Sequence, residues 1–111
     1  MIIRLLNLIQ NKIDIFAFLD ARMNAKQVER ISKALGDPYR LRIIEAIKNQ
    51  DGWLQCGSVL DMLNLAQSTV SHHIKQLTDA DLLIVEKDGR NARYQINKEV
   101  FAEYIKYLTS F

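Results

Sequence analysis

One stretch of the sequence, residues 65–83, combines an apolar stripe with side chains that could recognise a nucleic acid. Val70, Ile74 and Leu77 recur at helical spacing and predict the buried side of a helix. The other side is polar and weakly basic, with the side chains of Ser68, Ser71, His72 and Lys75. Such groups can donate hydrogen bonds to base edges and phosphates, and we expect no carboxylate one helical turn away to neutralise them. These residues alone are equally consistent with an ordinary amphipathic surface helix.

The composition indicates one packed domain without disulfides. With 111 residues, of which 49% are hydrophobic and 25% charged, the chain is long enough for a single core. The net charge of +2 permits nucleic-acid binding without requiring it. Because Cys56 is the only cysteine, no disulfide can form within the chain, and nothing indicates an oxidising compartment.

The N-terminal residues are apolar enough to raise the question of a membrane span or a signal peptide. Polar residues interrupt them at helical intervals, namely Arg4, Asn7, Asn11 and Asp14. No unbroken apolar run approaches the ~20 residues of a span, and no clear signal-peptide pattern is present. We therefore expect a cytoplasmic protein with no membrane partner.

Residues 2–19 predict a helix with an unusually wide apolar arc. The arc consists of Ile2, Leu5, Leu6, Ile9, Ile13, Phe16 and Leu19. Because one small domain cannot easily bury so wide an arc, burial against a second copy of the chain is the natural outcome. Packing against the helix's own domain is the alternative.

Two more helices are predicted before residue 50. Asn24 can cap the first, and its core face should be Val28, Ile31 and Leu35. Gly36 suits the C-terminal cap of this helix. Asp37 suits the N-cap of the next helix, and Pro38 suits its first position. The second helix should turn three residues inward, namely Leu41, Ile44 and Ile47. Its two arginines, Arg40 and Arg42, would project elsewhere, to reach a phosphate or to pair with carboxylates.

A turn at Asp51 and Gly52 leads into a predicted helix-turn-helix. We expect Ser58 to cap a short helix that ends at Leu63, and Asn64 to adopt the left-handed conformation that ends it. The helix that opens near Gln67 follows at once. Two helices joined by a tight turn, the second polar outside, form this motif.

After residue 82 the apolar period changes from that of a helix to that of strands. Residues 83–87 and 92–96 predict a hairpin, with Asp88 and Gly89 in its turn. We expect a basic hairpin tip with Lys87, Arg90 and Arg93. Asn97 can then cap a final helix whose apolar face is Phe101, Tyr104, Ile105 and Leu108.

The order of these elements is that of a winged helix, and three groups of motifs resemble the ArsR family of bacterial repressors. The first reads ALGDPYRLRII at residues 34–44 and the second LAQSTVSHHIKQL at 65–77. The third comprises ADLLI at 80–84 and GRNARYQI at 89–96. The match covers about residues 24 to 108. It implies a mainly α fold with a β-hairpin wing, a winged helix-turn-helix that works as a homodimer.

The resemblance also implies a sequence-specific transcriptional regulator, a repressor that binds double-stranded DNA at a palindromic operator. By position, the residues that would contact DNA are Gln67, Ser68, Thr69, Ser71, His72 and Lys75 on the recognition helix and Lys87, Arg90 and Arg93 on the wing. In the family the first and last helices form the dimer interface. The expected contacts here are Leu5, Ile9, Phe16, Leu19, Phe101, Tyr104, Ile105 and Leu108. Residues 1–22 precede the matching winged domain of residues 23–111, and the sequence is consistent with either an added dimer helix or an extension that derives from an upstream start codon.

The sequence departs from the family at two places. Many members carry a serine where Ala66 stands, so Gln67 or Ser68 would have to cap the recognition helix instead. Metal-sensing members carry two cysteine ligands where Gln55 and Gly57 stand, and Cys56 takes the place of an inward-packing valine. We therefore expect no metal site and no cofactor, and either constitutive repression or an unidentified small-molecule effector.

Other chemistry is weakly supported by these residues. His72 and His73 point about 100° apart on a helix, which is unsuited to a shared metal, and His73 is better explained as a brace on the helix flank. Cys56 has no neighbour in the sequence to activate it, so a buried structural thiol is favoured. We find no nucleophile or phosphate-loop motif and expect no enzyme. The alternative function is a winged-helix module that binds a protein, because a fold alone does not fix function.

Overall fold

The computed structural model describes residues 23–111, and its first two helices meet at a sharp corner. Helix α2 spans Ala25–Leu35 and helix α3 spans Pro38–Asn49. The Asn24 side chain accepts a hydrogen bond from the Gln27 backbone N–H, which confirms the expected cap. Gly36 follows α2 as its C-cap, and Asp37 caps α3 through the backbone N–H groups of Tyr39 and Arg40. These three predictions from the sequence are therefore correct.

The buried side of α3 differs from the prediction. Ile43 is fully buried and Ile47 lies one turn further along the same side, whereas Leu41 is 44% exposed. Two residues along a helix correspond to a rotation of about 200°, so Leu41 and Ile43 point in nearly opposite directions. The expectation that Leu41 faces the core was wrong because the run of apolar residues allows two registers.

The helix-turn-helix consists of α4 (Cys56–Leu63) and α5 (Gln67–Asp79). Asn64 between them has φ 52°, the left-handed conformation predicted for it. Ser58 does not cap α4, because the helix already begins at Cys56 and Gln55 is its N-cap, with no side-chain hydrogen bond. The reason lies just upstream, where the short strand β1 (Leu54–Gln55) pairs with the hairpin and fixes where the helix starts.

The hairpin consists of β2 (Leu83–Asp88) and β3 (Asn91–Ile96), and β3 lies between β2 and β1 in a three-stranded antiparallel sheet. Each hairpin strand is one residue longer at the turn than predicted, so the turn is Gly89 and Arg90 instead of Asp88 and Gly89. Gly89 has φ 62°, which suits the first position of a two-residue hairpin turn. Strand β1 was not predicted, since two residues are too short for a periodic pattern.

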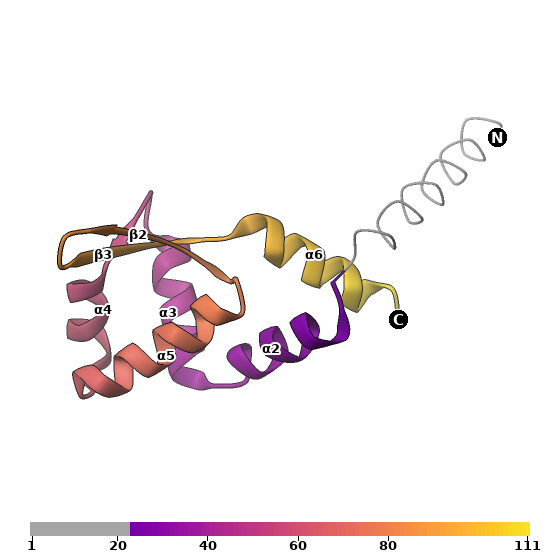
Figure 1. Cartoon of the computed structure of the whole chain (residues 1–111), viewed down its shortest axis with the longest axis horizontal. Helices are drawn as coiled ribbons and strands as arrows, with labels where there is room; N and C mark the ends of the chain where they lie inside the picture. Colours follow the sequence, from indigo (N-terminus) through magenta and orange to yellow (C-terminus); the bar gives the residue numbers. More distant parts are fainter. Residues whose placement is uncertain (1–22) are drawn as a thin grey trace.

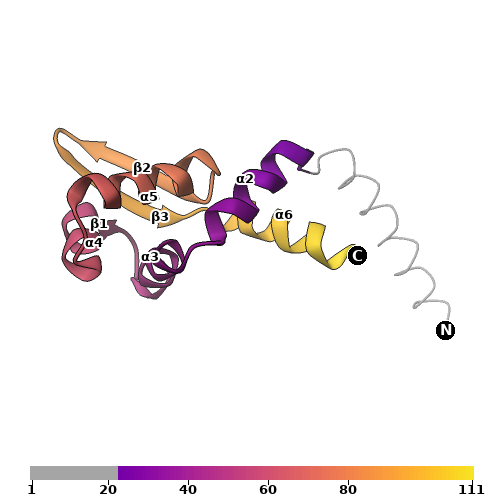
Figure 2. The ribbon, with the colours of Figure 1, turned by 90° about the horizontal axis from the view of Figure 1, so that it is seen from below.

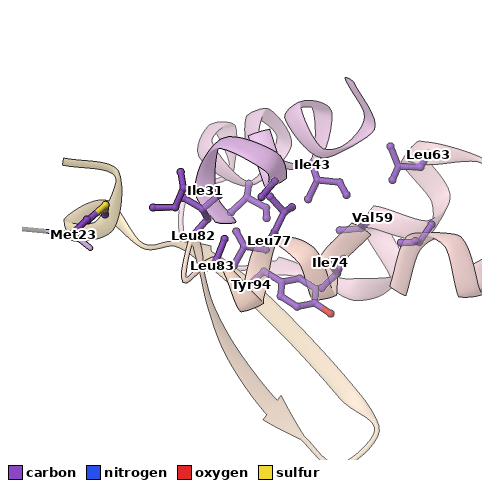
Figure 3. Packing of buried hydrophobic residues seen from close by; sticks show 14 residues of the cluster. Met23, Ile31, Ile43, Val59, Leu63, Ile74, Leu77, Leu82, Leu83 and Tyr94 are labelled. Atoms are coloured by element: carbon purple, nitrogen blue, oxygen red, sulfur yellow. The ribbon is translucent and has the colours of Figure 1, made fainter. Parts of the chain in front are cut away.

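The core lies between α2, α3, α4, α5 and the sheet (Figure 3). The helix-turn-helix and the hairpin occupy one end of the molecule in both views (Figures 1 and 2). Helix α6 (Lys98–Thr109) extends to the other end beside α2. The hydroxyl oxygens of Ser32 and Tyr104 lie 2.9 Å apart and join these two helices.

Helix α6 contains no fully buried residue. Phe101 and Tyr104 are half-buried against the core, whereas Ile105 and Leu108 are 56% and 48% exposed. Asn97 caps the helix by accepting from the Val100 N–H, as predicted. The four other expected dimer contacts, Leu5, Ile9, Phe16 and Leu19, lie outside the described residues. Within residues 23–111 no helix has the length and apolar character to cross a membrane.

A stability prediction follows from the start of α5. Its N-cap is Ala66, and no side chain there or nearby caps the helix, so Gln67 and Ser68 do not compensate. Ala66→Ser should supply an acceptor for an unpaired backbone N–H and raise the free energy of unfolding by about 0.5–1 kcal/mol. Urea denaturation measures this change. Ala102→Ser, at an exposed position inside α6, is the matched control and should lower stability slightly.

Candidate DNA-binding surface

The outward side of α5 brings together the six side chains expected to meet DNA. Its inward side holds it in the core through Val70, Ile74 and Leu77, all buried. The opposite side is fully available to a ligand, because every predicted contact there is exposed, namely Gln67, Ser68, Thr69, Ser71, His72 and Lys75. The helix therefore presents a continuous polar strip on a rigid support.

The charge of this strip is smaller than expected from the sequence. Lys75 Nζ lies 2.8 Å from Asp79 Oδ2, one helical turn further along α5. The expectation of no neutralising carboxylate was therefore wrong. Because both side chains are more than half exposed, the pair contributes little to stability and can exchange for a phosphate contact.

The hairpin carries basic residues in two different settings. Lys87 and Arg90 are exposed near its tip, as predicted. Arg93 lies further back and is half-buried, with Nη2 donating to Glu86 Oε1 at 2.8 Å. Its guanidinium carbon is also 4.7 Å from the centre of the Trp53 ring. Arg93 therefore lies in the middle of the hairpin, one residue pair behind Lys87, and its guanidinium already has partners.

Trp53 has a role that the sequence did not reveal. Its ring lies against the guanidinium of Arg93 on strand β3. The short strand β1 brings this contact about, because Gln55 pairs with Arg93 in the sheet. The alternation of side chains in β3 indicated which face Arg93 occupies, yet nothing local indicated the ring.

The guanidinium groups of the two arginines of α3 both donate to backbone carbonyls of neighbouring helices, although Arg42 is exposed. The Arg40 guanidinium donates to two backbone carbonyls at the end of α2. Arg42 Nη2 donates to the Met62 carbonyl of α4 at 3.3 Å. Neither forms an ion pair with a carboxylate, among residues 23–111. Both arginines tie helices together.

Cys56 lies at the start of α4, half-buried and packed against the core. It lines a groove of about 280 Å³ between α4, α5 and the hairpin, together with the buried Tyr94. Burial raises the pKa of the Tyr94 phenol, and the neighbouring thiol adds to this effect. Within residues 23–111, His72 and His73 join no cluster of potential metal ligands. The part of the chain from residue 23 onward has no group of three potential metal ligands.

Comparisons with known proteins agree with this arrangement. A family model described as a helix-turn-helix domain matches residues 35–86. The arsenical resistance operon repressor of Staphylococcus xylosus is 37% identical over 83 residues, which cover 75% of this chain and 77% of that protein. An uncharacterised helix-turn-helix transcriptional regulator of Bacillus subtilis, YceK, is 31% identical over 81% of this chain and 91% of its own length.

Solved structures show the same fold. The crystal structure of an ArsR family transcriptional regulator superimposes with a TM-score of 0.72 at 24% identity, covering 80% of this chain and 90% of that one. HlyU from Vibrio cholerae gives a TM-score of 0.60 at 25% identity, covering 79% of this chain and 95% of its own. The predicted winged helix-turn-helix is therefore confirmed.

Proposed function

The chain belongs to the ArsR family of DNA-binding transcriptional regulators, and from this premise we propose that it represses transcription as a homodimer on a palindromic operator. The observation that carries the proposal is the exposed polar strip of α5, fixed by a buried opposite side. One such helix per protomer, related by a two-fold axis, would enter successive major grooves. The protein would act in the cytoplasm with the DNA and would have no catalytic role.

Selection of duplexes from a random-sequence library by the purified protein tests this proposal. The enriched sequence should be an imperfect inverted repeat whose half-sites lie about 10 base pairs apart, or a multiple of that distance. Failure to enrich any sequence, together with weak salt-sensitive binding, would favour the alternative of a module that binds a protein partner. Direct repeats would contradict the two-fold dimer.

The wing residues should differ in their effect on DNA affinity. Arg90→Ala should weaken binding evenly across sequences and reduce the slope of log affinity against log salt by about 1, because an exposed arginine on phosphate releases one counterion. Arg93 is proposed as a wing contact as well, yet its guanidinium is already paired with Glu86. Arg93→Ala should therefore change the slope by less. Fluorescence anisotropy at several salt concentrations measures both slopes, and an equal loss for both variants would contradict this difference.

Transition metals are not expected to release the protein from DNA. At the start of α4, Gln55 and Gly57 provide no thiolate, and Cys56 alone cannot complete a tetrahedral site. The final helix contains no histidine. We propose that repression is either constitutive or answers to a small molecule. The test is to titrate Zn²⁺, Cd²⁺ and arsenite into the protein–DNA complex at fixed salt. Stoichiometric release that Cys56→Ser abolishes would contradict the proposal.

A further inference from the structure

A single side chain, that of Arg40, connects three helices at the corner between α2 and α3. Its Nε donates to the Ala34 carbonyl at 2.7 Å and its Nη2 to the Lys33 carbonyl at 3.1 Å. These carbonyls belong to the last turn of α2, where backbone acceptors lack helical partners and the helix dipole favours a cation. The remaining nitrogen, Nη1, lies 3.2 Å from Nδ1 of His73 on α5.

His73 occupies the inward side of the recognition helix, directly after His72 in the chain. It is 7% exposed, and among residues 23–111 no other side chain of a polar or charged residue is buried to this degree. A guanidinium can only donate, so Nδ1 of His73 must accept and its ring proton must lie on Nε2. The contact therefore requires a neutral imidazole.

The same corner is fixed from the other side by Asp37. Its Oδ1 accepts from the Tyr39 and Arg40 backbone N–H groups at 2.8 and 3.2 Å and lies 4.0 Å from His73 Nδ1. Burial alone would raise the pKa of Asp37, but these backbone hydrogen bonds, together with nearby positive charge such as that of Arg40, lower the pKa. The Asp37 carboxylate thus caps α3, and the Arg40 guanidinium contacts α5 through His73.

We propose that Arg40, acting through His73, positions the recognition helix for base reading without touching DNA. This inference rests on the proposed function. The other buried contacts of α5 are apolar and non-directional, so the contact between Arg40 and His73 is the directional side-chain link from this helix to the corner. This hydrogen bond adds a restraint on the rotation of α5, and base readout depends on such geometry.

The first test compares two variants that remove the same charge. Arg40→Gln breaks the corner contacts, whereas Arg30→Gln changes an exposed residue of α2. The measured quantity is the ratio of affinities for the selected duplex and for a shuffled duplex of the same composition. A partly unfolded sample lowers both affinities equally, so the ratio reports positioning alone. We expect the ratio to fall about tenfold for Arg40→Gln, the effect of a lost hydrogen bond to a charged group, and to stay unchanged for Arg30→Gln.

A second pair of variants separates positioning from packing at His73. Asn can place its amide oxygen near the site of Nδ1 and accept from Arg40, whereas Leu fills similar space without an acceptor. His73→Asn should keep most of the affinity ratio. In His73→Leu the affinity ratio should fall about tenfold, even if this variant unfolds at a higher temperature than His73→Asn. Equal ratios for the two variants would overturn the positioning role.

An unchanged ratio in Arg40→Gln would overturn the positioning role alone. Absence of any selected duplex for the unmodified protein would overturn the proposed function itself, and this inference with it.

Discussion

Leu108→Glu is expected to convert the proposed dimer into monomers or aggregates that bind the selected duplex poorly. Leu108 and Ile105 are 48% and 56% exposed on a helix that has no buried residue, and Phe111 beyond it is 90% exposed. An obligate interface buries a large apolar area, and a charge placed in it without a partner costs several kcal/mol. Because operator binding needs two recognition helices, loss of the dimer should also reduce affinity by orders of magnitude.

Sedimentation velocity of the variant, together with anisotropy on the selected duplex, measures both effects. Leu41→Glu is a matched control, since Leu41 is 44% exposed on α3 and the same substitution there should leave the dimer intact. A stable monomer for the unmodified protein would contradict the prediction. So would a dimer that persists in Leu108→Glu.

The second large effect is expected from truncating the polar strip of α5. Gln67→Ala and His72→Ala should each cost about 1–3 kcal/mol at the selected duplex and relax the sequence preference, because each removes a hydrogen bond to a base edge. Both residues are exposed, so the free energy of unfolding should change by less than about 0.5 kcal/mol. Gln67 is uncharged, and the salt dependence should therefore be the same as for the unmodified protein.

The measurement is a repeat of the library selection with each variant, followed by anisotropy on the original duplex. If His72→Ala selects the same sequence with the same affinity, His72 does not read the operator, and the base-reading face lies elsewhere. A uniform loss across all duplexes would instead assign His72 to the phosphate backbone.

Local signals in the sequence predicted most of the winged helix. The apolar period located α5, the caps Asn24, Asp37 and Asn97 located three helix starts, and Asn64 located the turn. These signals depend on neighbours within one or two helical turns. The same reasoning placed Leu41 in the core, because a run of apolar residues on α3 does not reveal which side meets the other helices.

The contacts that organise the candidate surface could not be predicted in the same way. Arg93 contacts the ring of Trp53, and Arg40 contacts His73. In both pairs the two residues are far apart in the chain. Each contact forms only when two separate elements pack together, so the sequence around either residue does not predict it. The pair of Lys75 and Asp79 is different, since its spacing of four residues was visible in the sequence and was overlooked.

The stability of helix α6 should depend on dimerisation and therefore on the protein concentration in the cell. Phe101 and Tyr104 pack against the core, but Ile105 and Leu108 gain little from their own domain, so part of the stabilisation of α6 would come from the dimer that we propose. Folding and association are then one equilibrium, and the melting temperature should rise with protein concentration. Dilution would unfold the last helix as well as separate the subunits, which exposes the chain to proteolysis. The amount of protein in the cell would thus set a threshold below which no repressor persists.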